Sequence, residues 1–131
     1  MRLDHYIKTN GIDDVGFIKI DVEGHEFEVI GGAVETIKKF CPLILCESEN
    51  RHIAHTGRTT NMFLDYIKEL KYNAYIISKI DLKFRSVTEI TIPENRSNQL
   101  EYFYNYWLIP EDLDSQFFLW MYQIKSQFVL E

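Results

Sequence analysis

The first half of the chain alternates amphipathic segments with short apolar runs, the pattern of helices and strands in turn. Apolar residues at helical spacing predict a short helix over 2–9 and a longer one over 24–41. Gly31 and Gly32 interrupt the longer segment, where we expect a break or close packing on a sheet, and Pro42 should end it. The segment is long enough for a crossover between two parallel strands.

Strands are predicted on either side of that helix. GFIKIDV (16–22) and LILC (43–46) are apolar at almost every position apart from Lys19, which is typical of parallel strands covered on both faces. A third strand is expected over 74–77. This order of elements predicts an open α/β sheet.

Between the second and third strands, the sequence ESENRHIAHTGRTT predicts a polar loop. Thr59 or Thr60 should then cap a helix over 61–71. The face of this helix that we expect to be buried comprises Met62, Phe63, Tyr66, Ile67 and Leu70.

The C-terminal part has a different pattern. Partial alternation predicts a half-exposed strand or hairpin over 82–92, followed by a polar loop over 93–100 and an aromatic-rich strand over 102–109. Pro110 should open a helix over 111–128. Because this helix is apolar on more than one side, it needs cover from more than one neighbour.

Composition restricts the class of protein. The 131 residues are 46% hydrophobic, which is enough for the core of one domain. The net charge of −6 and the lack of a basic run argue against a nucleic-acid partner or an anionic membrane surface. The N-terminus has no apolar signal-peptide region, and the longest apolar run is far shorter than the roughly 20 residues that cross a bilayer. We therefore expect a soluble, cytoplasmic protein.

Cysteine and histidine give weak metal signals. Cys41 and Cys46 are too few for a disulfide framework or a structural zinc site, so we interpret both as buried free thiols. His52 and His55 are spaced for metal binding, but since no helix is predicted there we interpret them as loop histidines.

Acidic side chains follow both of the first two predicted strands. The first strand ends in Asp21 and Glu23, and the second ends in Glu47, so parallel pairing should bring them to one edge of the sheet. Alternation along a strand should point Asp21 and Glu23 the same way, about 6.6 Å apart. Such carboxylates can hold a Mg²⁺-type cation or act as a general base. A simpler role for Asp21 is to cap the next helix.

The neighbouring residues also have simpler explanations. Lys19, in an apolar strand, is expected to form an internal ion pair with an acid. Gly24 permits a sharp exit from the strand, and His25 is best interpreted as an exposed loop histidine, although it could also be a base or ligand. Glu26 and Glu28 are typical surface acids that complement a helix dipole.

The stretch from Ile18 to Glu47 resembles the FkbM family of S-adenosylmethionine-dependent methyltransferases. The residues that carry the resemblance are Ile18, Lys19, Ile20, Asp21, Glu23, Gly24, Glu26, Gly32, Ala33, Pro42 and Glu47, with Leu3 and Asp4 ahead of them. The resemblance implies a partial Rossmann-like methyltransferase sheet, mostly parallel with antiparallel C-terminal strands. It also implies methyl transfer to an oxygen, often on a sugar or a small natural product.

On this resemblance, Asp21, Glu23 and Glu47 are the predicted catalytic residues, which orient or deprotonate the acceptor hydroxyl. Asp21 and Glu23 could also hold Mg²⁺, while Lys19, Gly24 and His25 are predicted to contact S-adenosylmethionine. The family's cofactor site lies in an upstream glycine-rich loop and acid, and neither is found here. Residues 1–131 are therefore expected to be one domain, the C-terminal half of an FkbM-type methyltransferase domain.

Three hypotheses follow. The first is a methyltransferase that lacks its N-terminal cofactor-binding half and acts on a sugar or other small molecule. The second is a non-catalytic remnant or subunit that pairs with the missing half or with a second copy, through the apolar surface of residues 113–128. The third is a metal-dependent hydrolase that uses Asp21, Glu23 and Glu47.

Overall fold

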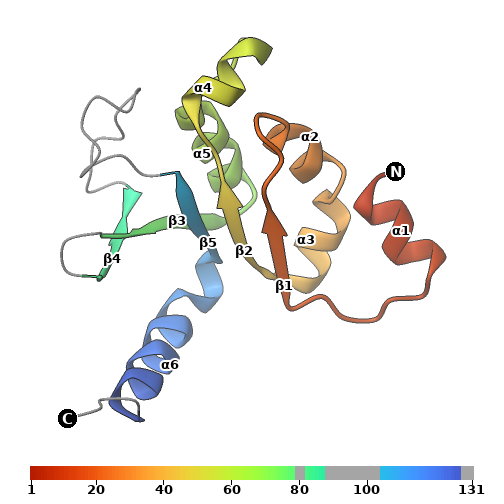
Figure 1. Cartoon of the computed structure of the whole chain (residues 1–131). Helices are drawn as coiled ribbons and strands as arrows, with labels where there is room; N and C mark the ends of the chain where they lie inside the picture. The colour runs from red at the N-terminus through yellow and green to blue at the C-terminus, as the bar shows by residue number, and fades with distance from the viewer. Residues whose placement is uncertain (79–81, 88–103, 128–131) are drawn as a thin grey trace.

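The computed structural model of the chain describes residues 1–78, 82–87 and 104–127. At its centre lies a five-stranded sheet with the strand order β1-β2-β5-β3-β4 (Figure 1). The strands are β1 (Phe17–Ile20), β2 (Leu43–Glu47), β3 (Tyr72–Ile77), β4 (Phe84–Ser86) and β5 (Asn105–Pro110). The strands predicted in the first half of the chain are therefore present, although β1 is shorter than expected.

Helices connect and cover these strands. They are α1 (Leu3–Thr9), α2 (Glu26–Gly31), α3 (Val34–Phe40), α4 (Asn50–Ile53), η1 (Ala54–Thr56), α5 (Thr60–Glu69), η3 (Glu111–Leu113) and α6 (Asp114–Gln127). The predicted break separates α2 from α3 at Gly32 and Ala33, so that expectation is confirmed. The polar loop expected before α5 is wrong in part, because α4 and η1 form there and place Ile53 in the core.

The sheet is mixed. β1 and β2 pair in parallel, as predicted, but the other three strand pairs are antiparallel. The expectation of a mostly parallel sheet is therefore wrong. The reason is that β5 comes back from the C-terminal part of the chain and inserts between β2 and β3, so β3 does not pair with β2 directly.

One side of the sheet carries the core. Residues from β1, β2, β3 and β5 pack there against α2, α3 and α5, including Ile20, Ile30, Ile37, Ile44, Cys46, Phe63, Ile67, Ala74, Ile76 and Leu108. On the other side, Phe17 of β1 remains 51% exposed. The expectation that β1 is covered on both faces is therefore wrong within the described residues, because the face that carries Phe17 and Lys19 is left exposed.

The cap of α5 and the two cysteines were also predicted from the sequence. Thr59 caps α5, since its Oγ1 accepts the Met62 N–H at 3.2 Å, but Met62 itself is exposed rather than buried. Cys46 is buried as expected, but the expectation is wrong for Cys41, which lies at the C-cap of α3 and is exposed. Both thiols are free.

The described residues include only part of the C-terminal segments predicted from the sequence. The strand predicted over 102–109 corresponds to β5, and the one over 82–92 corresponds to β4 in its described portion. The loop predicted over 93–100 lies outside the described residues. Within the described part of the chain, no helix is both long enough and apolar enough to cross a membrane.

Candidate functional site

The parallel pairing of β1 and β2 brings two acids together at one edge of the sheet. Ile20 lies opposite Cys46 in the register, so Asp21 and Glu47, the next residues along the two strands, are neighbours. This is the arrangement expected when parallel strands end side by side. Together with Glu23, two residues after Asp21, they make up the surface that we call the acidic edge.

Glu47 is the acid whose ionisation is most affected. Burial raises the pKa of its carboxyl, and the negative charges of Asp21 and Glu49 raise it further. Lys19 and His52 lower the pKa of Glu47, but by less than burial and the two acids raise it. The acidic edge thus contains one carboxylate that holds its proton more tightly than an isolated glutamate.

Glu23 is placed differently from the expectation. β1 ends at Ile20, so the alternation of a strand does not extend to Asp21 and Glu23, and the predicted common direction of their side chains loses its basis. Glu23 itself has a left-handed backbone with φ of 46°. Among the described residues, Glu23 is exposed and makes no side-chain hydrogen bond or ion pair. It therefore remains available to a ligand.

Lys19 pairs with Asp21 at the start of the acidic edge. Its Nζ lies 3.6 Å from Asp21 Oδ2, and both side chains are exposed. The expected ion pair is therefore present, but it lies on the surface rather than inside the sheet. Exposed pairs of this kind contribute little to stability.

Gly24 and Glu26 form a buried turn directly after the acidic edge. The Gly24 N–H donates to Glu26 Oε1 at 2.9 Å, and Gly24 has a φ of 104°. The Glu26 side chain is only 1% exposed, so its interpretation as a surface acid is wrong. The sequence feature that could have indicated this buried role of Glu26 is its spacing from Gly24. A glutamate two residues after a glycine can accept a hydrogen bond from the glycine amide.

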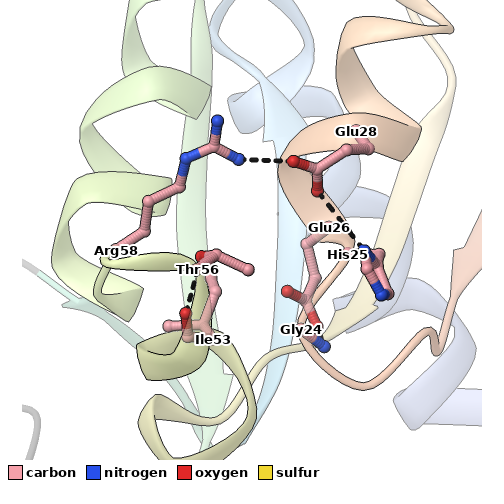
Figure 2. A network of polar contacts seen from close by, with 7 residues as sticks. All are labelled: Gly24, His25, Glu26, Glu28, Ile53, Thr56 and Arg58. Atoms are coloured by element: carbon pink, nitrogen blue, oxygen red, sulfur yellow. Dashed lines mark hydrogen bonds and ion pairs between the residues drawn. The ribbon is translucent and has the colours of Figure 1, made fainter.

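A second polar network joins the β1–α2 loop to the segment before α5 (Figure 2). Glu28 Oε1 accepts from Arg58 Nη1 at 2.6 Å, and Glu28 Oε2 lies 3.9 Å from His25 Nδ1. The pKa of Glu28 is lowered, by its own backbone N–H and by the Arg58 guanidinium, which also lies over the ring of Phe27. His25 is exposed, as expected, and its ring contacts that of His55 edge-on.

Metal binding has little support in the described residues. No group of three or more histidine, cysteine, aspartate or glutamate side chains there is arranged to hold a metal ion. His52 lies in α4 and His55 in η1, so the interpretation of these two as loop residues is wrong. The backbone forms short helical turns at this point, and the Thr60 N–H donates to Asn50 Oδ1 at 2.8 Å across the segment.

The hollows described on the surface lie away from the acidic edge. Their walls come from α1, α2, α3 and α5, and from the segment after α1, with Asp4, Arg2 and Tyr66 among the lining residues. None of these hollows is lined by Asp21, Glu23 or Glu47 in the described part of the chain. The shared concavity expected at the strand ends is thus not among them.

A comparison with known protein families matches the part of the chain that contains the acidic edge. The family model described as Methyltransferase FkbM domain matches residues 1–77, which include β1, β2, β3 and all three acids of the acidic edge. The chain belongs to the FkbM methyltransferase domain family. Membership implies methyltransferase activity in general, and the five-stranded α/β sheet is compatible with part of a methyltransferase fold. No curated protein and no solved structure matches the chain.

Use of S-adenosylmethionine in general is suggested by FkbM membership. That cofactor carries cationic sulfonium and ammonium groups, which suit the charge of Asp21 and Glu47, but also a carboxylate and a ribose. Among the described residues near the acidic edge, Lys19 is paired with Asp21 and the Gly24 N–H is donated to Glu26. These residues do not form a full cradle for the cofactor, and contacts from Lys19, Gly24 and His25 to it stay a prediction.

Proposed function

We propose that this FkbM-family chain takes part in methyl transfer from S-adenosylmethionine to a hydroxyl oxygen of a sugar or a small natural product. The acidic edge binds and orients the acceptor hydroxyl. The groups that hold the methionyl and ribose parts of the cofactor come from outside the acidic edge, either from an N-terminal half or from another chain.

The observation that carries this proposal is the position of Asp21 and Glu47 directly after the last paired residues of two parallel strands, where the charge of Asp21 acts on Glu47. Methylation of a hydroxyl oxygen releases its proton, and a carboxylate of raised pKa is the better acceptor for it. We assign that role to Glu47, because burial and the charge of Asp21 both raise its pKa. Asp21 and Glu23 then accept hydrogen bonds from neighbouring hydroxyls of the acceptor.

The test measures transfer of a labelled methyl group from S-adenosylmethionine to a panel of sugars and small phenols, with and without Mg²⁺. Glu47→Gln should lower turnover by at least about 10²-fold, the usual contribution of a general base. Asp21→Asn should weaken acceptor binding, since it removes charge but keeps an oxygen that can accept a hydrogen bond. Dependence on Mg²⁺ would assign a cation to Asp21 and Glu23.

Matched controls are available on α5. Glu69→Gln and Asp65→Asn change the same residue types at exposed positions outside the acidic edge, and both should retain activity. Full activity of Glu47→Gln would contradict the proposal. Methyl transfer that is unchanged when Asp21→Asn and Glu47→Gln are combined would contradict it as well.

A second candidate function is that of a non-catalytic subunit that pairs through its C-terminal helix. Leu119 and Trp120 of α6 are 60% and 54% exposed, although α6 also packs onto the sheet through the buried ring of Phe117. Large exposed apolar side chains that lie next to each other are typical of interaction surfaces. Figure 1 shows α6 extending from the end of β5 away from the other helices.

A further inference from the structure

Glu26 is a buried acid that the proposed chemistry does not use. Its side chain is 1% exposed at the first position of α2. An acid at a helix start is usually explained by the helix dipole, but such acids lie in water. A carboxylate removed from water is costly unless its oxygens accept hydrogen bonds, so its burial here calls for a specific role.

The only described partner of the Glu26 side chain is the backbone of the preceding loop. Oε1 accepts the Gly24 N–H at 2.9 Å, while Oε2 is buried without a hydrogen-bond partner in the described residues. Figure 2 shows the carboxylate lying against Gly24, on the side away from the Glu28–Arg58 pair. Glu26 thus reaches back from α2 to the turn rather than forward to the helix.

The turn that Glu26 holds is unfavourable for a free chain. Glu23 and Gly24 have consecutive positive φ values of 46° and 104°, and a non-glycine residue rarely adopts the left-handed conformation. Gly24 also lies so close to α4 that a Cβ on it would be 2.4 Å from the His52 carbonyl oxygen. Such a conformation persists only when the surroundings determine it.

The same turn connects the two acids of the acidic edge that follow β1. Asp21 lies between the end of β1 and this turn, so its position is fixed by the β1–β2 register on one side and by the turn on the other, while Glu23 is part of the turn itself. Burial raises the pKa of the Cys46 thiol, and the charges of Glu26, Glu47 and Asp21 raise it further. The carboxylate of Glu26 therefore lies within electrostatic reach of the end of β2, as do those of Asp21 and Glu47.

We propose that Glu26 is a positioning residue: its buried carboxylate holds the left-handed turn at Glu23 and Gly24, and thereby fixes the place of Glu23 and, from the C-terminal side, the position of Asp21 beside Glu47. Since this role rests on the proposed function of the acidic edge, it needs a readout that is independent of methyl transfer. The titration of Glu47 provides one, because it depends on how close Asp21 lies.

The test compares Glu26→Ala with Glu26→Gln in the full chain by NMR, without cofactor or acceptor. Gln removes the charge but keeps an oxygen that can accept the Gly24 N–H, whereas Ala removes both. In Glu26→Ala, the Gly24 amide should exchange with solvent at least roughly tenfold faster, as expected for the loss of one hydrogen bond. The pKa of Glu47, followed by its carboxyl carbon shift, should fall toward its ordinary value.

Glu26→Gln should keep both the slow exchange of Gly24 and the titration of Glu47. Equal changes in the two variants, or an unchanged Glu47 titration in Glu26→Ala, would overturn the proposal. If Glu26→Ala does not fold, Glu26→Asp replaces it, because the shorter side chain keeps the charge but loses the reach to Gly24. Failure of the proposed function shows itself separately, as full methyl transfer by Glu47→Gln whatever the state of the turn.

Discussion

At the scale of single residues, the ionised form of Glu47 is unfavourable in the folded chain. Burial, Asp21 and Glu49 all disfavour its ionised form, so the folded chain binds the Glu47 proton more tightly than the unfolded chain does. The stability linked to this proton is fully present below the unfolded pKa, and it is lost as the pH rises through the folded pKa. Near neutral pH, where Glu47 is ionised, the folded chain is therefore less stable than it would be with an uncharged side chain at position 47.

Glu47→Gln should consequently raise the free energy of unfolding at pH 7. At about pH 3, below the ordinary pKa of glutamate, the difference from the wild type should vanish because Glu47 is then protonated in both states. Urea denaturation at the two pH values measures this. Glu69→Gln on α5 is the control and should stay within about 0.5 kcal/mol of the wild type at both. A Glu47→Gln variant that is less stable than the wild type at pH 7 would contradict the sign of the shift.

Gly24 and Gly31 form a matched pair for testing the close approach of the turn to α4. An alanine at position 24 would meet the His52 carbonyl oxygen and would need a φ of 104°, whereas an alanine at 31 would meet nothing within 4 Å. We expect Gly24→Ala to lower the free energy of unfolding by more than about 1 kcal/mol, and Gly31→Ala to raise it by up to about 1 kcal/mol. Thermal and urea unfolding check both. Equal effects at the two positions would show that the approach to α4 is not tight.

At the scale of elements, α3 depends on a residue far from it in the sequence. The N-cap position of α3 is Ala33, which has no side-chain acceptor. Asp4 of α1 takes its place, since it accepts the N–H groups of Glu35 and Thr36 and the Thr36 hydroxyl at 2.7–3.1 Å. Figure 1 shows α1 lying beside α3, as this cap requires.

Asp4→Ala should lower the free energy of unfolding at pH 7 by roughly 1–2 kcal/mol, the range for loss of an N-cap. Burial tends to raise the pKa of Asp4, but the hydrogen bonds from Thr36 and Glu35 outweigh it, and the net pKa is lowered. The stability that Asp4 contributes is therefore present above its unfolded pKa and is lost as the pH falls through its folded pKa. The measurement is urea denaturation at pH 7 and in acid, where the difference between wild type and variant should shrink. Asp13→Ala, which changes an exposed aspartate, should have little effect at either pH.

Most of the elements could be predicted from local patterns, and the failures have physical reasons. Apolar spacing located β1, β2 and α5, and the glycine pair located the break between α2 and α3, because these signals depend on neighbouring residues. The turns α4 and η1 were missed because their sequence is polar, and they depend on contacts such as Asn50 to Thr60. The burial of Glu26 was missed for a similar reason, since it depends on how closely the loop approaches α4.

At the scale of the whole molecule, the exposed apolar residues of α6 bear on the oligomeric state. If they form a contact between two copies, light scattering should give a dimer, and Leu119→Gln with Trp120→Gln should shift it to a monomer. Gln116→Glu, a change at an exposed polar position of the same helix, is the control and should leave the dimer intact. A wild-type chain that is monomeric at high concentration would exclude pairing of two copies through α6.

The sequence by itself determined most of the helices and strands, that acids lie at the ends of the first two strands, and that the chain resembles the FkbM family. These properties depend on residue type and spacing along the chain. Only the tertiary structure decided that β5 inserts between β2 and β3, that Asp4 caps α3, and that Glu26 is buried against Gly24. Each of these depends on contacts with a loop, a helix or a strand whose position in space no local pattern encodes.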